Sequence, residues 1–217
     1  MQVCILLDRS GSMEPIWDEA LSSINAYVNE LNPKTKVHFA VFDSVNYRVV
    51  ESCRAGEWKP LKRTKEFGPR GTTPLYDSVA RIIEFAKLTN NPRTVLVVMT
   101  DGFENASKHT SLIDVKRLLT AFKDRGWATV FLGAGFDEIN LVAHSLDVSQ
   151  DKYINFKKDT MVMNMSNLGV RTMAYANTGA EISYSDADKL AAENVEGQTA
   201  SNNEQLLRAF NQASTGT

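Results

Sequence analysis

The sequence predicts an α/β fold, with a doubly wound, mostly parallel central sheet that carries helices on both of its faces. Short apolar runs without polar alternation indicate strands that are buried on both sides, as in parallel sheets. Helical patterns separate these runs in repeated order, which is typical of strand–helix–strand units. With 217 residues, 43% of them hydrophobic, the chain can bury one sizeable core. We expect about six strands, one of them an antiparallel edge strand.

The first part of the chain predicts a strand, a helix and a hairpin. The apolar run VCILL, at residues 3–7, predicts a strand, and apolar residues recur at steps of three and four over residues 16–31. Pro33 ends the helix that this spacing predicts. Two further strands, at 36–44 and 45–53, follow one another closely and predict an antiparallel hairpin.

The middle of the chain predicts a loop, a helix and the clearest strand. Residues 54–70 carry few strand or helix signals, so we expect a loop there. Thr73 is suited to cap the next helix and Pro74 to occupy its first position. The run RTVLVVMTD, at residues 93–101, then predicts a strand that is buried on both faces.

The remaining elements continue the same alternation until the composition changes. A helix begins near Ser111, a strand covers residues 127–135, and a short helix and a short strand precede a last helix at 161–179. From about residue 183 the chain becomes polar and rich in Ala, Asn, Glu, Ser and Gln. We therefore assign residues 1–182 to one domain and expect residues 183–217 to form a mobile polar tail.

The composition excludes several classes of protein. The net charge is −2 and the pI is about 6.0, with no basic face, so we expect no nucleic-acid partner. No stretch reaches the roughly 20 apolar residues of a membrane-spanning helix, so we expect no membrane partner. The first apolar run is too short for a signal peptide, which predicts a cytoplasmic protein. Two cysteines are too few for a secreted scaffold, and Cys4 is expected to be a buried free thiol.

Oxygen-bearing side chains follow the ends of two predicted strands and precede one helix. They belong to Asp8, Ser10, Ser12, Thr72, Thr73, Thr100 and Asp101. In an open parallel sheet, ligands bind at the carboxyl ends of the strands. These side chains are therefore the candidates for a binding site.

The spacing of the first three of these residues lets them converge on one point. Every second side chain of an extended segment points the same way, which applies to Asp8, Ser10 and Ser12, and Gly11 permits a sharp turn between the two serines. The set contains no histidine and no thiol. Oxygen ligands of this kind suit hard cations such as Mg²⁺, Mn²⁺ or Ca²⁺. The two carboxylates, of Asp8 and Asp101, would balance a divalent charge.

Three stretches of the sequence resemble the von Willebrand factor A (vWA) family. DRSGSM fits the family pattern Asp-x-Ser-x-Ser, RGTTPLYDSV resembles the family stretch GGTPLYDA, and VVMTDGFEN resembles the strand end that carries TDG. The three occur in the family's order, and the resemblance covers about residues 1–180. It implies a Rossmann-like vWA fold, of the small cytosolic type found in bacteria and their phages.

The resemblance also implies a metal-ion-dependent adhesion site. Its ligands would be Asp8, Ser10, Ser12, Thr73 and, directly or through water, Asp101. Thr73 is preferred because the family's threonine directly precedes PLYD, but Thr72 replaces a family glycine and the choice between the two threonines stays open. The bound ion, Mg²⁺ with Mn²⁺ or Ca²⁺ as alternatives, would offer an open coordination position to a Glu or Asp of a partner protein. The implied function is that of a protein-binding module rather than an enzyme.

Residues next to these ligands are candidates for a rim that contacts the partner. Met13 and Phe103 offer apolar contact, and Glu14 and Glu104 would repel some acidic partners. The complete rim comprises Arg9, Met13, Glu14, Arg70, Phe103, Glu104 and Asn105. Arg9 and Arg70 are the members suited to pair with further acidic groups of a partner.

Two other interpretations of the same residues are open to test. Asp8 to Ser12 could form only a helix cap with turn residues, since Asp and Ser are favoured there. Asp8 could also be the nucleophile of a Mg²⁺-dependent phosphatase or hydrolase. That chemistry usually requires a second acid two residues on, where this chain has Ser10, or a lysine at a later strand end.

Overall fold

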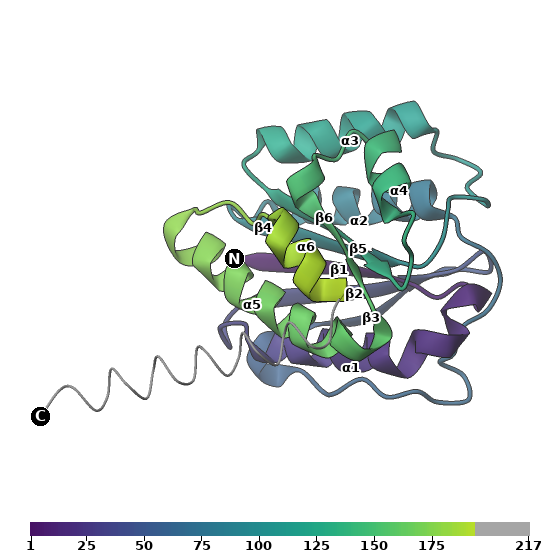
Figure 1. The fold of residues 1–217 in the computed structure, drawn as a ribbon. Coiled ribbons are helices and arrows are strands. Elements are labelled where there is room, and N and C mark those ends of the chain that lie inside the picture. Colours follow the sequence, from purple (N-terminus) through teal and green to yellow (C-terminus); the bar gives the residue numbers. More distant parts are fainter. Residues whose placement is uncertain (194–217) are drawn as a thin grey trace, which may run out of the picture.

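Six strands form one sheet in the computed structural model, which describes residues 1–193 (Figure 1). The strands are β1 (Gln2–Asp8), β2 (Lys36–Phe42), β3 (Tyr47–Arg54), β4 (Thr94–Thr100), β5 (Ala128–Ala134) and β6 (Tyr153–Phe156). Their order across the sheet is β3-β2-β1-β4-β5-β6. Only β3 runs antiparallel to its neighbour, with a register shift between Phe39 and Ala40 of β2. The predicted fold class is confirmed, including the antiparallel edge strand.

Helices cover both faces of the sheet. They are α1 (Trp17–Asn29), α2 (Leu75–Thr89), α3 (Leu112–Asp124), α4 (Ile139–Ser145), α5 (Met161–Thr178) and α6 (Asp186–Glu193). Helices α1, α5 and α6 pack on one face, and α2, α3 and α4 pack on the other (Figure 1). The two layers leave the carboxyl ends of the parallel strands open at one edge.

Burial on both faces explains why the central strands show no polar alternation. All seven residues of β1 are buried, and so are all seven of β4. Val3, Ile5 and Leu7 contribute to the core beneath α1 and α5, whereas Cys4 and Leu6 contribute to the core beneath α2. Successive side chains of one strand thus enter different cores, and both cores require apolar residues.

The start of α2 differs from the sequence prediction. The helix begins at Leu75, and Pro74, which occupies the capping position, offers no side-chain acceptor to its N–H groups. The Oε2 atom of Glu104 instead accepts a hydrogen bond from the N–H of Tyr76 at 2.9 Å. Thr73 therefore does not cap this helix, because Glu104 accepts from the N–H of Tyr76 and the Ser107 hydroxyl accepts from that of Asp77. Of the two candidate caps of α3, Thr110 and Ser111, the structure has Ser111, whose Oγ accepts from the N–H of Asp114 at 3.3 Å.

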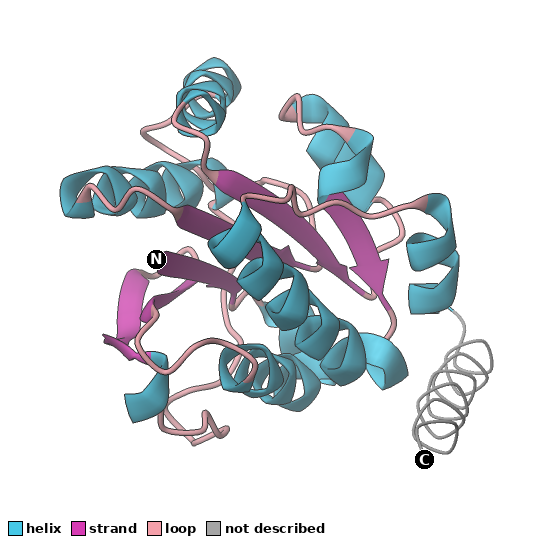
Figure 2. Ribbon diagram, turned by 90° about the vertical axis from the view of Figure 1, so that its left-hand side faces the viewer, coloured by secondary structure: helices cyan, strands magenta, loops and turns pink. Residues whose placement is uncertain are grey.

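The packed part of the chain extends beyond residue 182. Helix α6, which precedes the grey trace in Figure 2, contacts β6 and buries Ala192 completely. The hydroxyl of Thr160 donates to the carbonyl oxygen of Ala192 at 2.6 Å, and Arg171 binds Asp188 at 2.5 Å. Residues 183–193 therefore belong to the folded unit rather than to a mobile tail. The rest of the predicted tail lies outside the described residues.

Two further predictions concern cysteines and membrane segments. Cys4 and Cys53 are both free thiols, and Cys4 is buried, as expected. Across residues 1–193, every helix is too short or too polar to span a bilayer.

Candidate metal centre

The neighbouring strands β1 and β4 bring the predicted ligands to one edge of the sheet. The two strands are parallel and in register from Gln2 with Thr94 to Leu7 with Met99. Asp8 therefore ends β1 next to the end of β4, where Asp101 follows. Parallel pairing is the reason why residues more than 90 positions apart in sequence meet at this edge.

Hydrogen bonds join five residues, four predicted ligands and the neighbouring Thr100, into one cluster. Ser10 Oγ lies 3.0 Å from Ser12 Oγ, and Ser12 Oγ donates to Asp101 Oδ1 at 2.8 Å. Asp8 Oδ1 accepts from the N–H of Ser10 at 2.7 Å, and Asp8 Oδ2 accepts from Thr100 Oγ1 at 2.7 Å. The alternation at positions 8, 10 and 12 thus produces the convergence that the sequence predicted.

The loop that carries Thr73 lies against the loop that carries the serines. The N–H of Gly11 donates to the carbonyl oxygen of Gly71 at 3.0 Å. The Oγ1 atom of Thr73 lies 4.0 Å from the point where a Cβ atom of Gly102 would stand. A Cβ atom there would be in ordinary van der Waals contact with this hydroxyl, so Thr73 lies beside the loop that carries Asp101.

The two adjacent threonines point to different neighbours. Thr73 is buried, and its N–H donates to Asn105 Oδ1 at 2.8 Å. Thr72 is exposed, and its N–H donates to Ser44 Oγ at 3.0 Å, on the side of β2. Thr73 therefore lies toward the end of β4, where Asp101 is, and Thr72 lies toward the end of β2.

The carboxylates of Asp8 and Asp101 are buried or partly buried, and no positively charged side chain of residues 1–193 pairs with them. Burial raises the pKa of Asp8 to about 7, although hydrogen bonds from Thr100 and Ser10 act in the opposite direction. Burial also raises the pKa of Asp101, against the hydrogen bond from Ser12. None of the ion pairs within residues 1–193 involves either aspartate. A divalent cation would supply the missing charge.

The donor chemistry of the cluster fits a hard cation. Every side chain in it offers oxygen, and two of the groups are carboxylates. Among the residues that the structure describes, no three His, Cys, Asp or Glu side chains gather as a metal-binding group. A metal site in this part of the chain would therefore use hydroxyl ligands as well as carboxylates, as the cluster around Asp8 does.

The predicted rim divides into buried and exposed residues. Arg9 and Met13 have exposed fractions of 1% and 0%, so they offer no contact surface to a partner, contrary to the expectation. Glu14 is exposed and forms an ion pair with Arg63, and Phe103 is 48% exposed. Arg70 keeps 44% of its side chain exposed. The exposed part of the rim is thus smaller than the sequence predicted.

Glu104 and Asn105 fix the loop that follows β4. Besides Tyr76, the Glu104 carboxylate accepts from the N–H of Ser107 at 2.6 Å and from its hydroxyl at 2.7 Å. Asn105 holds the backbone of Thr73, as described above. These two side chains therefore position the loops of the cluster, a role that the sequence prediction missed because Tyr76 and Thr73, the partners across the loops, are distant in sequence.

Asp43 is a further residue that sequence reasoning missed. Its Oδ2 atom accepts from Arg9 at 2.8 Å and 2.5 Å and from Arg70 Nε at 3.1 Å. Burial alone would raise the pKa of Asp43, but hydrogen bonds from Asn46, Arg9, Val45 and Arg70 lower it. Its position at the end of β2, in the stretch VFDS, is the sequence signal that could have identified it.

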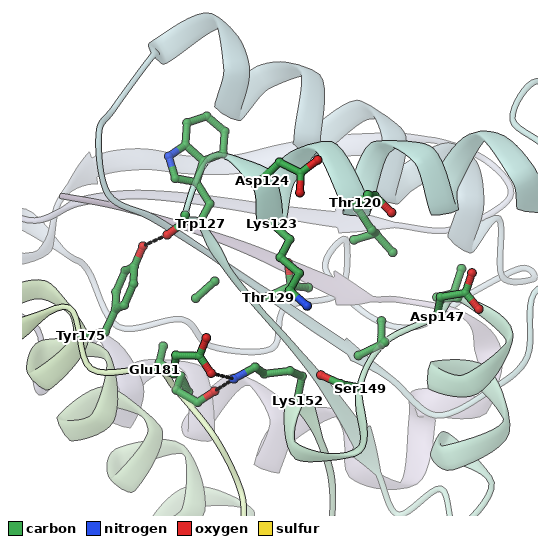
Figure 3. Close-up of a pocket in the computed structure, with 16 residues that line it drawn as sticks. Thr120, Lys123, Asp124, Trp127, Thr129, Asp147, Ser149, Lys152, Tyr175 and Glu181 are labelled. Carbon is green, nitrogen blue, oxygen red and sulfur yellow. Dashed lines mark hydrogen bonds and ion pairs between the residues drawn. The ribbon is translucent and has the colours of Figure 1, made fainter.

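A cavity of about 360 Å³ lies elsewhere, at the amino ends of β5 and β6 (Figure 3). Trp127, Leu146 and Ile182 contribute to its apolar lining. Lys152 Nζ donates to the carbonyl oxygen of Ile182 at 2.7 Å and binds Glu181 at 3.3 Å, and Figure 3 shows these contacts at its wall. Because the strands are parallel, this cavity is at the opposite edge of the sheet from Asp8 and Asp101.

Several solved structures, among them vWA domains, share the fold of this chain. A von Willebrand factor type A protein from Catenulispora acidiphila superposes with a TM-score of 0.58 at 14% identity, over 79% of this chain and 42% of the other. The pilus adhesin SpaC from Lactobacillus rhamnosus GG gives 0.58 at 14%, over 80% and 30%. The vWF domain of the pili tip protein Mfa5 from Porphyromonas gingivalis gives 0.60 at 9%, over 83% and 97%. The chain spans less than half the length of the first two proteins.

The family follows from the sequence itself. The profile of the VWA domain containing CoxE-like proteins matches residues 1–133, and the chain belongs to that family. vWA domains commonly mediate interactions between proteins. No curated protein matches the chain.

Proposed function

We propose that this chain is a protein-binding module whose contact depends on a divalent metal ion. Asp8, Ser10, Ser12 and Thr73 hold Mg²⁺, and Asp101 holds it directly or through water. The ion then presents an open coordination position to a Glu or Asp of a partner protein. Mn²⁺ and Ca²⁺ suit the same oxygen donors, and we propose a cytoplasmic location for the protein.

The hydrogen-bonded cluster of hydroxyls and carboxylates carries this proposal. Ser12 stands between Ser10 and Asp101, at 3.0 Å and 2.8 Å, and is itself exposed. Asp8 is buried and forms no ion pair with any cationic side chain of residues 1–193. An ion bound here would replace contacts between the ligands with contacts to the metal, and it would be reached from the side of Ser12. Two carboxylates leave a divalent ion with no excess negative charge, so that a further carboxylate can join.

The burial of Asp8 argues against its use as an enzyme nucleophile. Its exposed fraction is 0%, and both of its oxygen atoms accept hydrogen bonds. An attacking carboxylate needs access to the substrate and the correct approach geometry. We therefore propose a binding function and no catalysis, and a phosphatase assay with p-nitrophenyl phosphate and Mg²⁺ should show no turnover that Asp8→Ala removes.

Mn²⁺ provides the direct test, because its effect on water relaxation reports both binding and open positions. We expect the wild-type chain to bind one Mn²⁺, with competition from Mg²⁺, and Asp101→Asn to weaken binding at least tenfold. Asp124→Asn, at an exposed position on α3, is the matched control and should bind as the wild type does. Acetate should then lower the relaxation effect by displacing water from the bound ion.

Two outcomes would contradict the proposal. If Mn²⁺ binding is not saturable, or is equal in the wild type and Asp101→Asn, the cluster is not the metal site. If Mn²⁺ binds but acetate leaves its water shell unchanged, the ion offers no position to a partner's carboxylate. Circular dichroism of each variant confirms that the comparison is made between folded chains.

A further inference from the structure

Two exposed side chains, the aromatic ring of Phe103 and the positively charged guanidinium of Arg70, lie on either side of the candidate metal centre. Phe103 follows β4 and contacts Phe136, which follows β5. Arg70 contacts Asp43, which follows β2. The proposed ligands come from β1 and β4, so the strand order places the aromatic ring toward β5 and the guanidinium toward β2. A partner segment that crosses the metal along this edge would meet both.

The ring of Phe103 packs edge-on against Phe136, and hydrogen bonds of the two following residues fix its loop. Its centroid lies 5.0 Å from that of Phe136, at an interplanar angle of 85°. Phe136 is only 8% exposed and belongs to the core beneath α2 and α3, whereas Phe103 is 48% exposed. The hydrogen bonds of Glu104 and Asn105 fix the residues that follow it directly. A single exposed aromatic residue is common, but one that is held rigid beside a binding site loses little entropy when a partner covers it.

Arg70 carries the surplus positive charge of a buried cluster. Two arginines, Arg9 and Arg70, share the single carboxylate of Asp43, which leaves one positive charge in excess. Arg9 is buried and donates two hydrogen bonds to that carboxylate, whereas Arg70 donates one and is 44% exposed. The excess charge therefore faces solvent at Arg70, where a second acidic group of a partner can pair with it.

We propose that Phe103 and Arg70 select the residues that flank the partner's metal-binding acid. The partner fits as an extended segment with a Glu or Asp at the metal, a large apolar side chain over Phe103 and a second acidic residue at Arg70. This inference rests on the proposed metal-dependent function, and it adds the chemical class of the segment that the site accepts. Phe103 and Arg70 set specificity and do not hold the ion.

Short synthetic peptides test the apolar contact. Each peptide has a central glutamate between glycines, with phenylalanine or alanine as one neighbour, on either side in separate peptides. With Mn²⁺ bound, we expect the phenylalanine peptide of one orientation to displace metal-bound water at a concentration about three- to tenfold lower than its alanine counterpart. Phe103→Ala should abolish this preference and leave Mn²⁺ affinity unchanged. The control Leu88→Ala removes an apolar side chain that is 86% exposed near the end of α2, and should retain the preference.

The same assay tests the basic contact with an aspartate added on the other side of the glutamate. The wild type should prefer the peptide with two acids by about threefold or more at low salt, and less at high salt. Arg70→Gln should remove the preference, whereas Arg48→Gln, at an exposed position of β3, should keep it.

The outcomes separate this inference from the proposal on which it rests. Absence of Mn²⁺ binding overturns both. Normal Mn²⁺ binding with equal affinity for all glutamate peptides overturns only the roles of Phe103 and Arg70. Preferences that survive Phe103→Ala and Arg70→Gln overturn those roles as well, because another surface must then select the partner.

Discussion

At the scale of single residues, the most informative group is the carboxyl of Asp8, because its burial disfavours the ionised form. It is the last residue of β1 and is fully buried, and its pKa is raised to about 7. Proteins tolerate a buried carboxylate when a cation or several donors compensate for lost hydration. Here the donors are the Thr100 hydroxyl and the Ser10 N–H, and the compensation that they provide is incomplete.

This burial predicts how stability changes with pH in the absence of metal. A carboxyl whose pKa is higher in the folded than in the unfolded chain favours folding when it is protonated. Its contribution is complete below pH 4 and is lost as the pH rises toward 7 and above. We expect Asp8→Asn to avoid this loss, so that in EDTA at pH 8 the variant is more stable than the wild type by on the order of 2–4 kcal/mol.

Urea denaturation at pH 4.5, 6 and 8 measures this difference, and Asp124→Asn is the control. The advantage of Asp8→Asn should shrink toward low pH, and saturating Mg²⁺ should reverse the order at pH 8. An advantage that is independent of pH would show that Asp8 does not carry the buried charge. An unchanged order in Mg²⁺ would count against metal binding at this site.

Sequence reasoning was effective for residues whose neighbours in the chain are also their neighbours in space. The alternation of Asp8, Ser10 and Ser12 needed only local geometry, and those side chains converge as expected. The burial of Arg9 depends on Asp43, which is 34 residues away, and no local pattern indicates that pairing. The predicted rim failed at Arg9 for this reason, and not because its charge was misjudged.

At the scale of elements, α1 and α5 form the most extensive contact between helices in the described part of the chain. Figures 1 and 2 show the two helices side by side on one face of the sheet. Gly169 of α5 is buried, and a Cβ atom there would lie 2.5 Å from Glu30 Cβ and 2.9 Å from the carbonyl oxygen of Tyr27. Only glycine permits this approach, because neither the backbone of Tyr27 nor the root of the Glu30 side chain can move away easily.

The close contact at Gly169 predicts that replacing this helical glycine by alanine lowers the free energy of unfolding, whereas the same change usually raises it. Gly→Ala in an ordinary helix stabilises by up to about 1 kcal/mol. We expect Gly169→Ala to destabilise the chain by roughly 1–3 kcal/mol, because α5 must move away from α1. Thermal or urea denaturation measures the change, with Asn167→Ala, at an exposed position of the same helix, as the control. A neutral or stabilising effect of Gly169→Ala would mean that the helices are not in close contact here.

The sequence predicted the strands and central helices well because their apolar patterns are long and regular. It misplaced the start of α2, where Glu104 of a distant loop replaces a local cap. It also assigned α6 to a tail, because Ala192 is the one buried residue of this helix and leaves no apolar pattern. Short elements held by polar contacts leave little periodic signal, so sequence patterns identify them poorly.

At the scale of the whole molecule, the proposed ion should stabilise the entire fold. A ligand that binds only the folded state raises the free energy of unfolding, by about 2.7 kcal/mol at a free concentration of 100 times its Kd. We expect Mg²⁺ to raise Tm relative to EDTA in the wild type and in Asp124→Asn, and to have little effect on Asp101→Asn. Differential scanning calorimetry over a range of Mg²⁺ concentrations tests this. An equal increase in all three chains would indicate an effect of ionic strength and not a site.

The order in which the loops of the candidate centre are synthesised matters for the assembly of the site, beginning with the hydrogen bond from Gly11 to Gly71. This hydrogen bond joins two loops of the candidate centre, and the third loop, with Asp101, comes only after β4 has been made. A growing polypeptide on the ribosome therefore lacks one of the two carboxylates until nearly half of the chain has been synthesised. In the proposed site, nascent chains that end before Asp101 would lack the complete ligand set and would not engage a partner through the ion.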